Sequence, residues 1–522
     1  MKIKKLLALV LAGAMTATML VGCGNNSGST TSDGGSATTT DSGSSNAGSS
    51  DSGSGDTTAP AANGDVVTIN VIRPLFNLGA VNSEQVQKVQ DAVNAYIADK
   101  INVQVNVTEF VSGEYGDKAN LALANNELNL MWTASWQGTV GTNDLYANNA
   151  AYDITDLLPG TPLYGSMAEG QWEATKYNGR NYFIPVYKDN VEGYDIMARK
   201  DLVDKYGWDM SSVKKLADIE PYLADAKAEG LKYPWLTQKT AMFYRFYIDS
   251  FDFFTADVNS NWVAVDRASN TVVETILTPE YLEFCTLMAE WGEAGYISED
   301  DAAKVTTDTT TQSQDWAFSW WTDIPVNDEA NARYGQDVVM APVTQRWAHS
   351  TSALGSCWAV TANCTPEQAQ ACVDFMGLLY TDSHLADLWT FGIEGEDFNY
   401  DANGHVEQSP DAKYNHSMWE SASATIVTPM YNEPDNKADL YVDFNGGANT
   451  SCAAGFRFNK EPVAAQFSAC QNVFEEYGFP LENGGIPASD VQATIDAYYA
   501  ALNEAGFQDI VNEFVSQYDA WK

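Results

Sequence analysis

Aromatic side chains stand beside acidic and amide side chains at several predicted loops of this sequence. Trp136 and Gln137 follow one short apolar run, and Trp320, Trp321 and Asp323 follow another. An aromatic ring offers an apolar face, and a planar carboxylate or amide beside it offers hydrogen bonds. Together they suit a ligand that has both C–H faces and hydroxyl groups, as a sugar does. These pairs predict a binding site for a polyhydroxylated ligand.

The full set of candidates comes from several separate parts of the chain. The candidate ligand-binding residues are Phe76, Trp136, Gln137, Tyr187, Lys188, Glu192, Tyr244, Trp320, Trp321, Asp323 and Trp419. For each aromatic residue the alternative is core packing, because Trp and Tyr are largely buried in most proteins. We expect Trp132 to be core and Trp136, Trp320 and Trp321 to face the site, while Trp419 stays open between the two.

Catalytic and metal-binding patterns are weak here. The sequence has no HExxH, GxSxG or P-loop motif, and its four His residues are scattered. A glycoside hydrolase needs only two suitably spaced carboxylates, so among 70 acidic residues that alternative stays open. The stretch 397–403 alternates oxygen-bearing side chains but lacks the glycine and the final glutamate of a calcium loop, so we expect a hairpin there. No cofactor and no metal are expected.

Alternating strand and helix patterns must position these residues. Asn82 is a plausible helix N-cap with Gln85 three residues on, and apolar residues then recur at helical spacing. Strands are predicted at 66–73, 101–110 and 128–131. Strand, helix, strand, helix, strand is typical of a parallel α/β sheet, whose ligands gather at the carboxyl ends of the strands. This order predicts that Phe76 and Trp136 lie near one cleft.

The N-terminus carries export signals. Lys2, Lys4 and Lys5 precede an apolar run, and Leu20-Val21-Gly22-Cys23 closes it. This is a secretory signal peptide over residues 1–22. The final four residues resemble the bacterial lipobox, which implies that Cys23 is lipidated. Residues 24–63 are small and polar, so residues 23–63 are expected to form a lipidated, flexible tether.

Charge and cysteine content limit the partners. A formal net charge of −42 argues against nucleic acid and against a surface that binds anionic lipid. Beyond Cys23, six cysteines remain, and their spacing matches no zinc motif. They are compatible with disulfides, as in exported proteins, or with buried thiols, and the sequence leaves both open.

Several motifs together resemble family 1 extracellular solute-binding proteins, the sugar-binding subunits of ABC importers. Asn178-Gly179-Arg180, Ile184-Pro185 and Arg199-Lys200-Asp201-Leu202 match the hairpin and crossover strand of that family. The LplA-like lipoprotein branch is similar at the segments 153–158, 391–395, 458–463 and 491–521. The likeness runs over nearly the whole chain, with gaps around 240–277 and 346–356.

This resemblance implies an α/β, two-lobed periplasmic-binding-protein-like fold of type II, with an interlobe cleft and several hinge crossings. The crossings are expected near 187–194, 340–345 and 397–409. The N-lobe would comprise 64–188 plus 345–400, and the C-lobe 189–344 plus 401–522. Such lobes close on a ligand like a hinged clamp.

The implied protein is a lipid-anchored subunit on the extracellular face of the cell membrane. It would capture a carbohydrate, an oligosaccharide by preference, and pass it to ABC permease subunits without acting as an enzyme. We expect a monomer that touches the membrane only through its lipid. A surface glycoside-active enzyme, a peptide-binding lipoprotein and a sensory role remain as alternatives, and the sequence leaves the particular sugar open.

Overall fold

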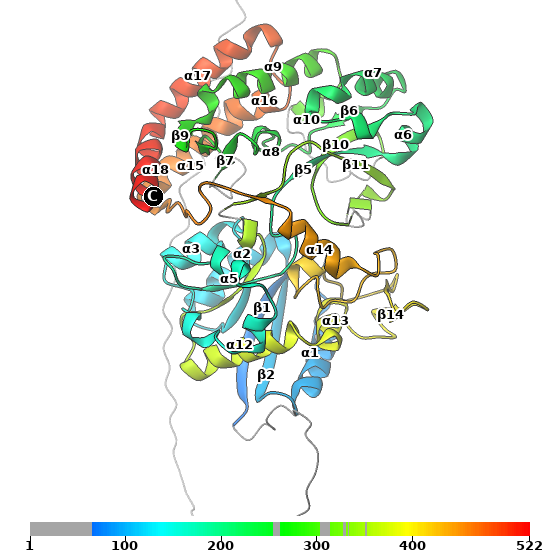
Figure 1. Cartoon of the computed structure of the whole chain (residues 1–522), viewed down its shortest axis with the longest axis vertical. Coiled ribbons are helices and arrows are strands. Elements are labelled where there is room, and N and C mark those ends of the chain that lie inside the picture. The colour runs from blue at the N-terminus through cyan, green and yellow to red at the C-terminus, as the bar shows by residue number, and fades with distance from the viewer. Residues whose placement is uncertain (1–64, 254–260, 303–313, 327–329, 332–333, 350–351) are drawn as a thin grey trace, which may run out of the picture. The chain divides into compact units, whose positions relative to one another are not determined.

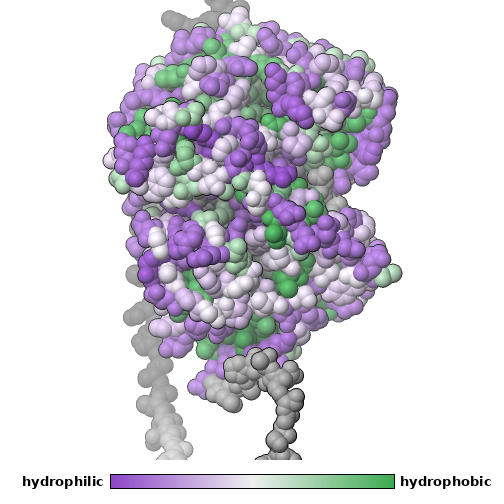
Figure 2. Space-filling model, viewed as in Figure 1, coloured by the Kyte–Doolittle hydropathy of each residue, from purple (hydrophilic) through white to green (hydrophobic). Residues whose placement is uncertain are grey.

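The computed structural model describes residues 65–253, 261–302, 314–326, 330–331, 334–349 and 352–522. The predicted signal peptide and tether, with Cys23, lie outside these described residues. The described chain forms two α/β lobes, which we call the first and the second layer (Figure 1). Each has its own main sheet and its own hydrophobic core. The face drawn in Figure 2 is mainly hydrophilic, in keeping with the many acidic side chains of the sequence.

The first sheet has the strand order β2-β1-β3-β13-β4. Its strands are β1 (Val67–Leu75), β2 (Val103–Val111), β3 (Leu130–Thr133), β4 (Phe183–Pro185) and β13 (Cys357–Val360). Both β2 and β3 run parallel to β1, which confirms the predicted parallel arrangement. β13 arrives from far along the chain and pairs antiparallel with β3 and β4. The N-terminal pattern therefore forms a sheet that a later segment extends.

Helices cover this first sheet. The first of them begins where predicted, because the Asn82 side chain accepts the Gln85 amide at 3.0 Å. The apolar stripe of that helix, from Val86 to Ile97, is buried. The helices of this layer are α1 (Ser83–Ile97), α2 (Ser112–Ala124), α3 (Thr142–Ala147), α4 (Pro162–Gly165), α5 (Glu169–Ala174), α12 (Pro366–Leu379), α13 (Ser383–Phe391) and α14 (Lys437–Gly446).

The second sheet has the order β11-β5-β10-β6, and a three-stranded meander lies in the same layer. The sheet consists of β5 (Tyr194–Arg199), β6 (Tyr233–Leu236), β10 (Trp316–Thr322) and β11 (Val338–Pro342). The meander consists of β7 (Phe251–Phe253), β8 (Val263–Asp266) and β9 (Thr271–Glu274). β5 runs antiparallel to both its neighbours, so this sheet is mixed.

The helices of the second layer come from the middle and the end of the chain. In Figure 1, α9 and α17 run side by side. The set is α6 (Lys200–Tyr206), α7 (Glu220–Ala228), α8 (Phe243–Phe246), α9 (Pro279–Glu293), α10 (Glu299–Ala302), α15 (Ala464–Val473), α16 (Phe479–Glu482), α17 (Val491–Glu504) and α18 (Phe507–Trp521). A π-helical turn, Phe474–Gly478, joins α15 to α16. The C-terminal helices are thus part of the second core rather than a separate body.

The two larger hydrophobic cores of the described residues show where the chain passes from one layer to the other; a smaller third cluster around Trp316 and Tyr334 lies in the second layer. The first core takes buried residues from 69–187 and 354–441, and the second takes them from 194–341 and 453–518. The first passage lies between Tyr187 and Tyr194, the segment predicted for it. The second passage lies between Ala341 and Leu354, so it extends further along the chain than the predicted crossing near 340–345. The third lies at 441–453.

The third passage corrects the sequence-based boundaries. Residues 401–441, which we assigned to the C-lobe, pack in the first core, where Val406 and Tyr414 are buried. The predicted hairpin exists, as β14 (Phe398–Tyr400) paired antiparallel with β15 (Val406–Gln408). It turns the chain back onto the core it came from, so it cannot serve as a crossing. Similarly, β12 (Trp347–Ala348), assigned to the N-lobe, pairs with β16 (Asn449–Thr450), and Trp347 packs against the second core.

The cysteines at 285, 357, 364, 372, 452 and 470 are free thiols, and all but Cys452 are buried. The second of the two open possibilities, buried thiols, therefore holds for most of them. Across the described ranges, no three His, Cys, Asp or Glu side chains gather as a metal site. No helix in the described part of the chain is long and apolar enough to cross a membrane.

Candidate ligand-binding site

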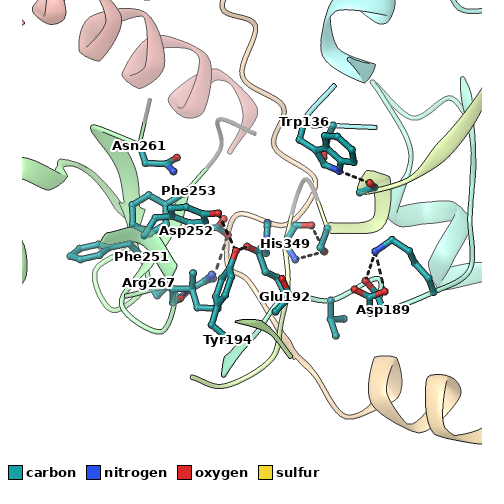
Figure 3. A pocket seen from close by; sticks show the side chains of 18 residues that line it. Trp136, Asp189, Glu192, Tyr194, Phe251, Asp252, Phe253, Asn261, Arg267 and His349 are labelled. Atoms are coloured by element: carbon teal, nitrogen blue, oxygen red, sulfur yellow. Dashed lines mark hydrogen bonds and ion pairs between the residues drawn. The ribbon is translucent and has the colours of Figure 1, made fainter. Parts of the chain in front are cut away.

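A cavity of about 260 Å³ is lined by residues of both layers and of the passages between them. The first layer contributes Ser135 and Trp136, and the meander of the second contributes Phe251, Asp252 and Phe253. Figure 3 shows Trp136 across the cavity from the meander residues, with Glu192 and His349 between them. The remaining lining residues are Lys188, Asp189, Val191, Glu192, Tyr194, Tyr244, Ile248, Asn261, Arg267, Thr322, His349, Ser352 and Gly355.

Trp136 presents an aromatic face at this cavity. It follows β3 and is 45% exposed, which is uncommon for the largest side chain. Its Nε1 donates a hydrogen bond of 2.7 Å to the carbonyl oxygen of Gly355. The edge of the ring is therefore anchored while much of its face stays accessible.

An aromatic cluster packs behind Trp136. Phe76 lies with its ring centre 6.2 Å from Trp136 and 4.9 Å from Trp419. Trp132 is fully buried in the same cluster, and its Nε1 donates to Ser356 Oγ at 2.9 Å, so the prediction that it is core is confirmed. Phe76 and Trp136 are indeed neighbours, as the strand order predicted. Phe76 packs against Trp136 and Trp419 packs behind Phe76; both are half-buried, and neither lines the cavity.

Glu192 is the hydrogen-bonded centre of the cavity floor. Its backbone N–H donates to Trp347 O at 2.9 Å, and its carbonyl accepts the Trp347 N–H at 2.8 Å. Its carboxylate forms an ion pair with His349 Nε2 and accepts a hydrogen bond from the Tyr194 hydroxyl. Residues of the first and second passages are thereby joined by both backbone and side chains.

This ion pair changes the protonation of its members. Burial alone raises the pKa of Glu192, but the charge and hydrogen bond of His349 outweigh it and lower the pKa to about 2. Burial lowers the pKa of His349, and the carboxylate of Glu192 reverses this and raises the pKa above its ordinary value of 6.5. The floor of the cavity therefore carries a carboxylate at neutral pH.

The second layer closes the opposite wall with aromatic and charged groups. Tyr244 lies on α8, and its hydroxyl is 3.2 Å from that of Tyr194. The Arg267 guanidinium donates to Asp252 Oδ2 at 3.3 Å and stacks on the Trp347 ring at 3.9 Å. Asp252 is fully buried, and its Oδ1 has no hydrogen-bond partner among the described residues. This wall thus combines aromatic rings with a buried carboxylate and a guanidinium.

The pair Trp320 and Trp321 does not reach the cavity as predicted. We expected both in a loop after a strand ending near Phe318, but β10 continues to Thr322. Adjacent residues of a strand point to opposite faces, so the two rings separate. Trp320 packs against the second core under the Arg245 guanidinium, 3.7 Å away, and Trp321, 8% exposed, packs against Tyr334 on the other face. Only Thr322 of this segment lines the cavity.

Asp323, another predicted ligand residue, is engaged elsewhere. Both its carboxylate oxygens accept from Arg346, at 2.6 and 3.2 Å, and Arg346 lies 4.0 Å above the Phe444 ring. Arg346, in the second passage, is thus engaged in a salt bridge with Asp323, just after the end of β10. Asp323 is 4% exposed and is not part of the cavity lining.

Of the remaining predicted residues, some line the cavity and others do not. Lys188 and Glu192 line the cavity, and Lys188 Nζ lies 3.0 Å from Asp189 Oδ1. Tyr187 is buried in the first core, and Gln137 is half-buried outside the cavity. Of the predicted set, Trp136, Lys188, Glu192 and Tyr244 meet at one cavity, and the other residues do not.

Sequence reasoning missed much of the second-layer wall. Phe251, Asp252, Phe253 and Arg267 come from the meander, where no resemblance was found between 240 and 277. The run Phe251-Asp252-Phe253 places a carboxylate between two aromatic rings. The predicted ligand-binding residues combine the same groups, so this run could have indicated the site. His349 lies in the second gap of the family resemblance, 346–356. Its place in the site becomes evident from its ion pair with Glu192.

Two α/β layers joined by three passages, with a polar and aromatic cavity lined by both, define the class of two-lobed solute-binding folds. Residues 91–395 match the family described as bacterial extracellular solute-binding protein, and the chain belongs to this family. Residues 452–522 match a domain of unknown function, DUF3502.

Relatives and solved structures agree with this assignment. A carbohydrate ABC transporter substrate-binding protein of Streptococcus pneumoniae is 22% identical over 442 residues, covering 82% of this chain and 86% of the relative. The crystal structure of the N-glycan transport solute binding protein NgtS of that species is similar with a TM-score of 0.74 at 20% identity, covering 87% of this chain and 98% of the other. An HMO-binding, ABC-transporter-associated solute-binding protein of Bifidobacterium longum infantis is similar with a TM-score of 0.59 at 14% identity, covering 87% of this chain and 99% of the other.

Proposed function

We propose that this protein captures a carbohydrate, by preference an oligosaccharide, outside the cell and delivers it to an ABC importer. The observation that carries the proposal is the anchored, half-exposed ring of Trp136 facing acidic and aromatic residues across one cavity. A sugar ring stacks its C–H face on such an indole while its hydroxyls bond to carboxylates beside it. The pneumococcal relative is named for carbohydrate transport, which supports this ligand class.

An oligosaccharide is favoured over a single sugar. The similar pneumococcal protein has been crystallised in complex with Man5GlcNAc, with a TM-score of 0.66 and 19% identity, covering 87% of this chain and 98% of the other.

The ligand-binding residues that we propose are taken from the cavity lining. They are Trp136, Lys188, Glu192 and Tyr244 of the predicted set, together with Asp189, Asp252, Arg267 and His349. We further propose the LplA-like branch within the family, on the segments noted above.

The export and anchoring steps are proposals from the N-terminal sequence. Residues 1–22 would be removed, and Cys23 would carry the lipid that holds the protein at the extracellular face of the membrane. The body would act as a monomer and contact the importer's permease subunits. It would bind without turnover, since its proposed role ends with delivery of an unchanged ligand.

Capture would involve motion about the three passages. A ligand that touches both layers gains its full binding energy only when they close on it, so it shifts the population toward the closed state. We propose that the lobes divide at 187–194, 341–354 and 441–453. The pairing of Glu192 with Trp347 and of β12 with β16 would make the passages move together.

A thermal-shift screen of the mature protein tests the ligand class. The panel would hold Man5GlcNAc, linear glucans, single sugars and short peptides. A ligand at 100 times its dissociation constant adds about 2.7 kcal/mol to the free energy of unfolding, so binders stand out. Stabilisation by peptides alone would overturn the carbohydrate proposal. Incubation of a binding oligosaccharide with the protein, followed by chromatography, tests turnover, and shortened products would indicate a glycoside-active enzyme instead.

A further inference from the structure

The C-terminal segment 452–522 lines no part of the cavity in the described chain, yet it reaches the wall from behind. Glu482, at the end of α16, is 5% exposed. Its Oε2 accepts the backbone N–H of Met242 at 2.6 Å and that of Phe243 at 3.0 Å. Its Oε1 lies 3.4 Å from the Tyr281 hydroxyl, which donates to it. One buried carboxylate thus holds the start of α8.

The helix that Glu482 holds carries a cavity residue. α8 spans only Phe243–Phe246, and a helix this short has almost no internal hydrogen bonds to keep it formed. Its next residue after the capped amides is Tyr244, which lines the cavity and contacts the hydroxyl of Tyr194. The position of Tyr244 therefore depends on acceptors supplied from outside the helix.

Two further contacts from the same C-terminal segment brace the same wall. Asn483 Nδ2 donates to Thr240 O at 3.2 Å, just before α8. The Tyr498 hydroxyl on α17 accepts from Trp262 Nε1 at 2.8 Å, next to Asn261, which lines the cavity. The segment thus holds both pieces of chain that frame the wall.

Close backbone packing beside Glu482 fixes its position behind the cavity wall. Gly484 has a φ of +72° and lies against α9, where a Cβ on Gly292 would stand 2.2 Å from the Gly484 carbonyl oxygen. No side chain fits between these backbones, so the turn that follows Glu482 is locked in place. Burial raises the pKa of Glu482 to about 7, although the amides of Phe243 and Met242 act to lower it. Burying a carboxyl group here is costly, and the hydrogen bonds from Met242, Phe243 and Tyr281 offset part of that cost.

We propose that Glu482 is a positioning residue of the ligand site, which sets Tyr244 at the cavity wall, and that this bracing is the contribution of the C-terminal domain to binding. The inference rests on the proposed function, because it assumes that Tyr244 faces a ligand. It assigns the domain of unknown function to the binding lobe rather than to a separate activity.

The test compares variants of the mature full-length chain. Glu482→Gln keeps an oxygen that accepts the two amides, whereas Glu482→Met keeps the volume and removes the acceptors. Asp387 is the matched control, because it is 2% exposed and accepts the Thr428 N–H at 2.9 Å in the first layer. Its variants are Asp387→Asn and Asp387→Leu. The readouts are hydrogen–deuterium exchange of peptides covering 241–247 and the affinity for Man5GlcNAc.

Glu482→Met is expected to speed exchange at 241–247 and to weaken Man5GlcNAc binding, each by roughly tenfold, as the loss of a buried hydrogen bond does. Glu482→Gln should stay within about threefold of the wild type in both. Asp387→Leu should change neither, although it lowers overall stability. Equal behaviour of Glu482→Met and wild type, or the same local changes in Asp387→Leu, would overturn the proposal.

If Glu482→Met fails to fold, Glu482→Asp replaces it, because the shorter side chain withdraws the acceptor while keeping the carboxyl group. Unchanged exchange at 241–247 in that folded variant would equally overturn the proposal. A wild type that binds no carbohydrate of the thermal-shift panel would count against the proposed ligand class and not against the bracing of α8 by Glu482, since the exchange measurement needs no ligand. The two proposals therefore fail separately.

Discussion

Trp136 Nε1 donates a hydrogen bond of 2.7 Å to the carbonyl oxygen of Gly355, which joins the end of β3 to a segment more than two hundred residues later. The bond orients the indole while leaving it 45% exposed at the cavity. A ring held in this way loses little conformational entropy when a ligand stacks on it. Preorganisation of this kind makes Trp136 the strongest candidate for a dominant contact.

Replacing Trp136 by Ala should therefore weaken oligosaccharide binding by about 2 kcal/mol, or roughly thirtyfold, as buried aromatic contacts do at binding hot spots. The free energy of unfolding should change much less than for a core Trp, because the ring is 45% exposed. Calorimetric titration and urea unfolding measure the two quantities. Trp132→Ala is the contrasting variant and should destabilise the first core by about 3 kcal/mol or more. A Trp136→Ala variant with normal affinity would remove this residue from the site.

The Glu192–His349 pair predicts a pH-dependent stability. The folded-state pKa of Glu192, about 2, lies below its ordinary value of 4.5, so its contribution is present above pH 4.5 and is lost as the pH falls toward 2. The folded-state pKa of His349 lies above 6.5, so its contribution is present below pH 6.5 and is lost as the pH rises through the raised pKa. Arg245 also favours the charged Glu192, while Asp252 and Arg267 act on His349 in opposite directions.

Glu192→Gln should thus cost most between pH 4.5 and pH 6.5, on the order of 3 kcal/mol, as breaking a buried ion pair does. The difference from wild type should shrink on both sides of that window. Urea unfolding at a series of pH values checks this. A difference that stays constant from pH 3 to about pH 9 would show that the two side chains do not titrate as a pair.

Asp195 should lower the free energy of unfolding at neutral pH, whereas Glu192 raises it. Burial, reinforced by the negative charge of Asp323, raises its pKa to about 7, and Arg346 only partly offsets this. Because the folded state holds this proton more tightly than the unfolded chain, stability falls as the pH rises from 3.8 to about 7. Asp195→Asn should therefore stabilise the protein above pH 7 by on the order of 2 kcal/mol and have little effect near pH 3.8.

Asp201 is the control for this prediction. Its pKa is lowered by the hydrogen bond from Arg199, so Asp201→Asn should reduce stability slightly instead of raising it. Denaturant unfolding at pH values on either side of 7 compares the two variants. If Asp195→Asn is destabilising above pH 7, Asp195 is ionised and paired in the folded protein, contrary to our interpretation.

Cys23→Ala should release the protein from the membrane or leave it unprocessed. The reason is that diacylation needs the thiol of that residue, and no other part of the chain is proposed to hold the membrane. Fractionation of cells, with a labelled fatty acid, measures the change. Cys452→Ala is the matched control, since Cys452 is an exposed free thiol of the body and should keep the membrane fraction unchanged. Fatty-acid labelling that persists in Cys23→Ala would rule out Cys23 as the lipid site.

Ligand binding should compact the protein without changing its secondary structure. Closing about three passages moves whole layers, so the radius of gyration should fall at saturating oligosaccharide while the far-ultraviolet circular dichroism stays the same. Small-angle scattering with and without ligand provides the measurement. An unchanged radius at saturation would argue for a rigid cavity and against a clamp.

The local parts of the fold were predictable because their signals are short-range. Asn82 and Gln85 mark a helix start three residues apart, and the periods of strands and helices between 66 and 131 repeat within a few residues. Where prediction failed, long-range pairing decided the outcome. The local sequence predicts a hairpin at 397–403, but the return of the chain to the first core depends on contacts of Val406 and Tyr414 with that core. The prediction for Trp321 is wrong because β10 continues to Thr322, beyond the apolar run that ends at Phe318.

The sequence by itself determined the family, the parallel order of the first three strands and the placement of Trp136 at a strand end. Only the tertiary structure decided that Glu192 meets His349, that Trp136 is anchored by Gly355, and that Glu482 braces α8. Each of these pairs joins segments at least 150 residues apart, so no local pattern encodes it. Such contacts exist because burial of the two hydrophobic cores brings the passages and the C-terminal helices together, and that burial is a property of the whole chain.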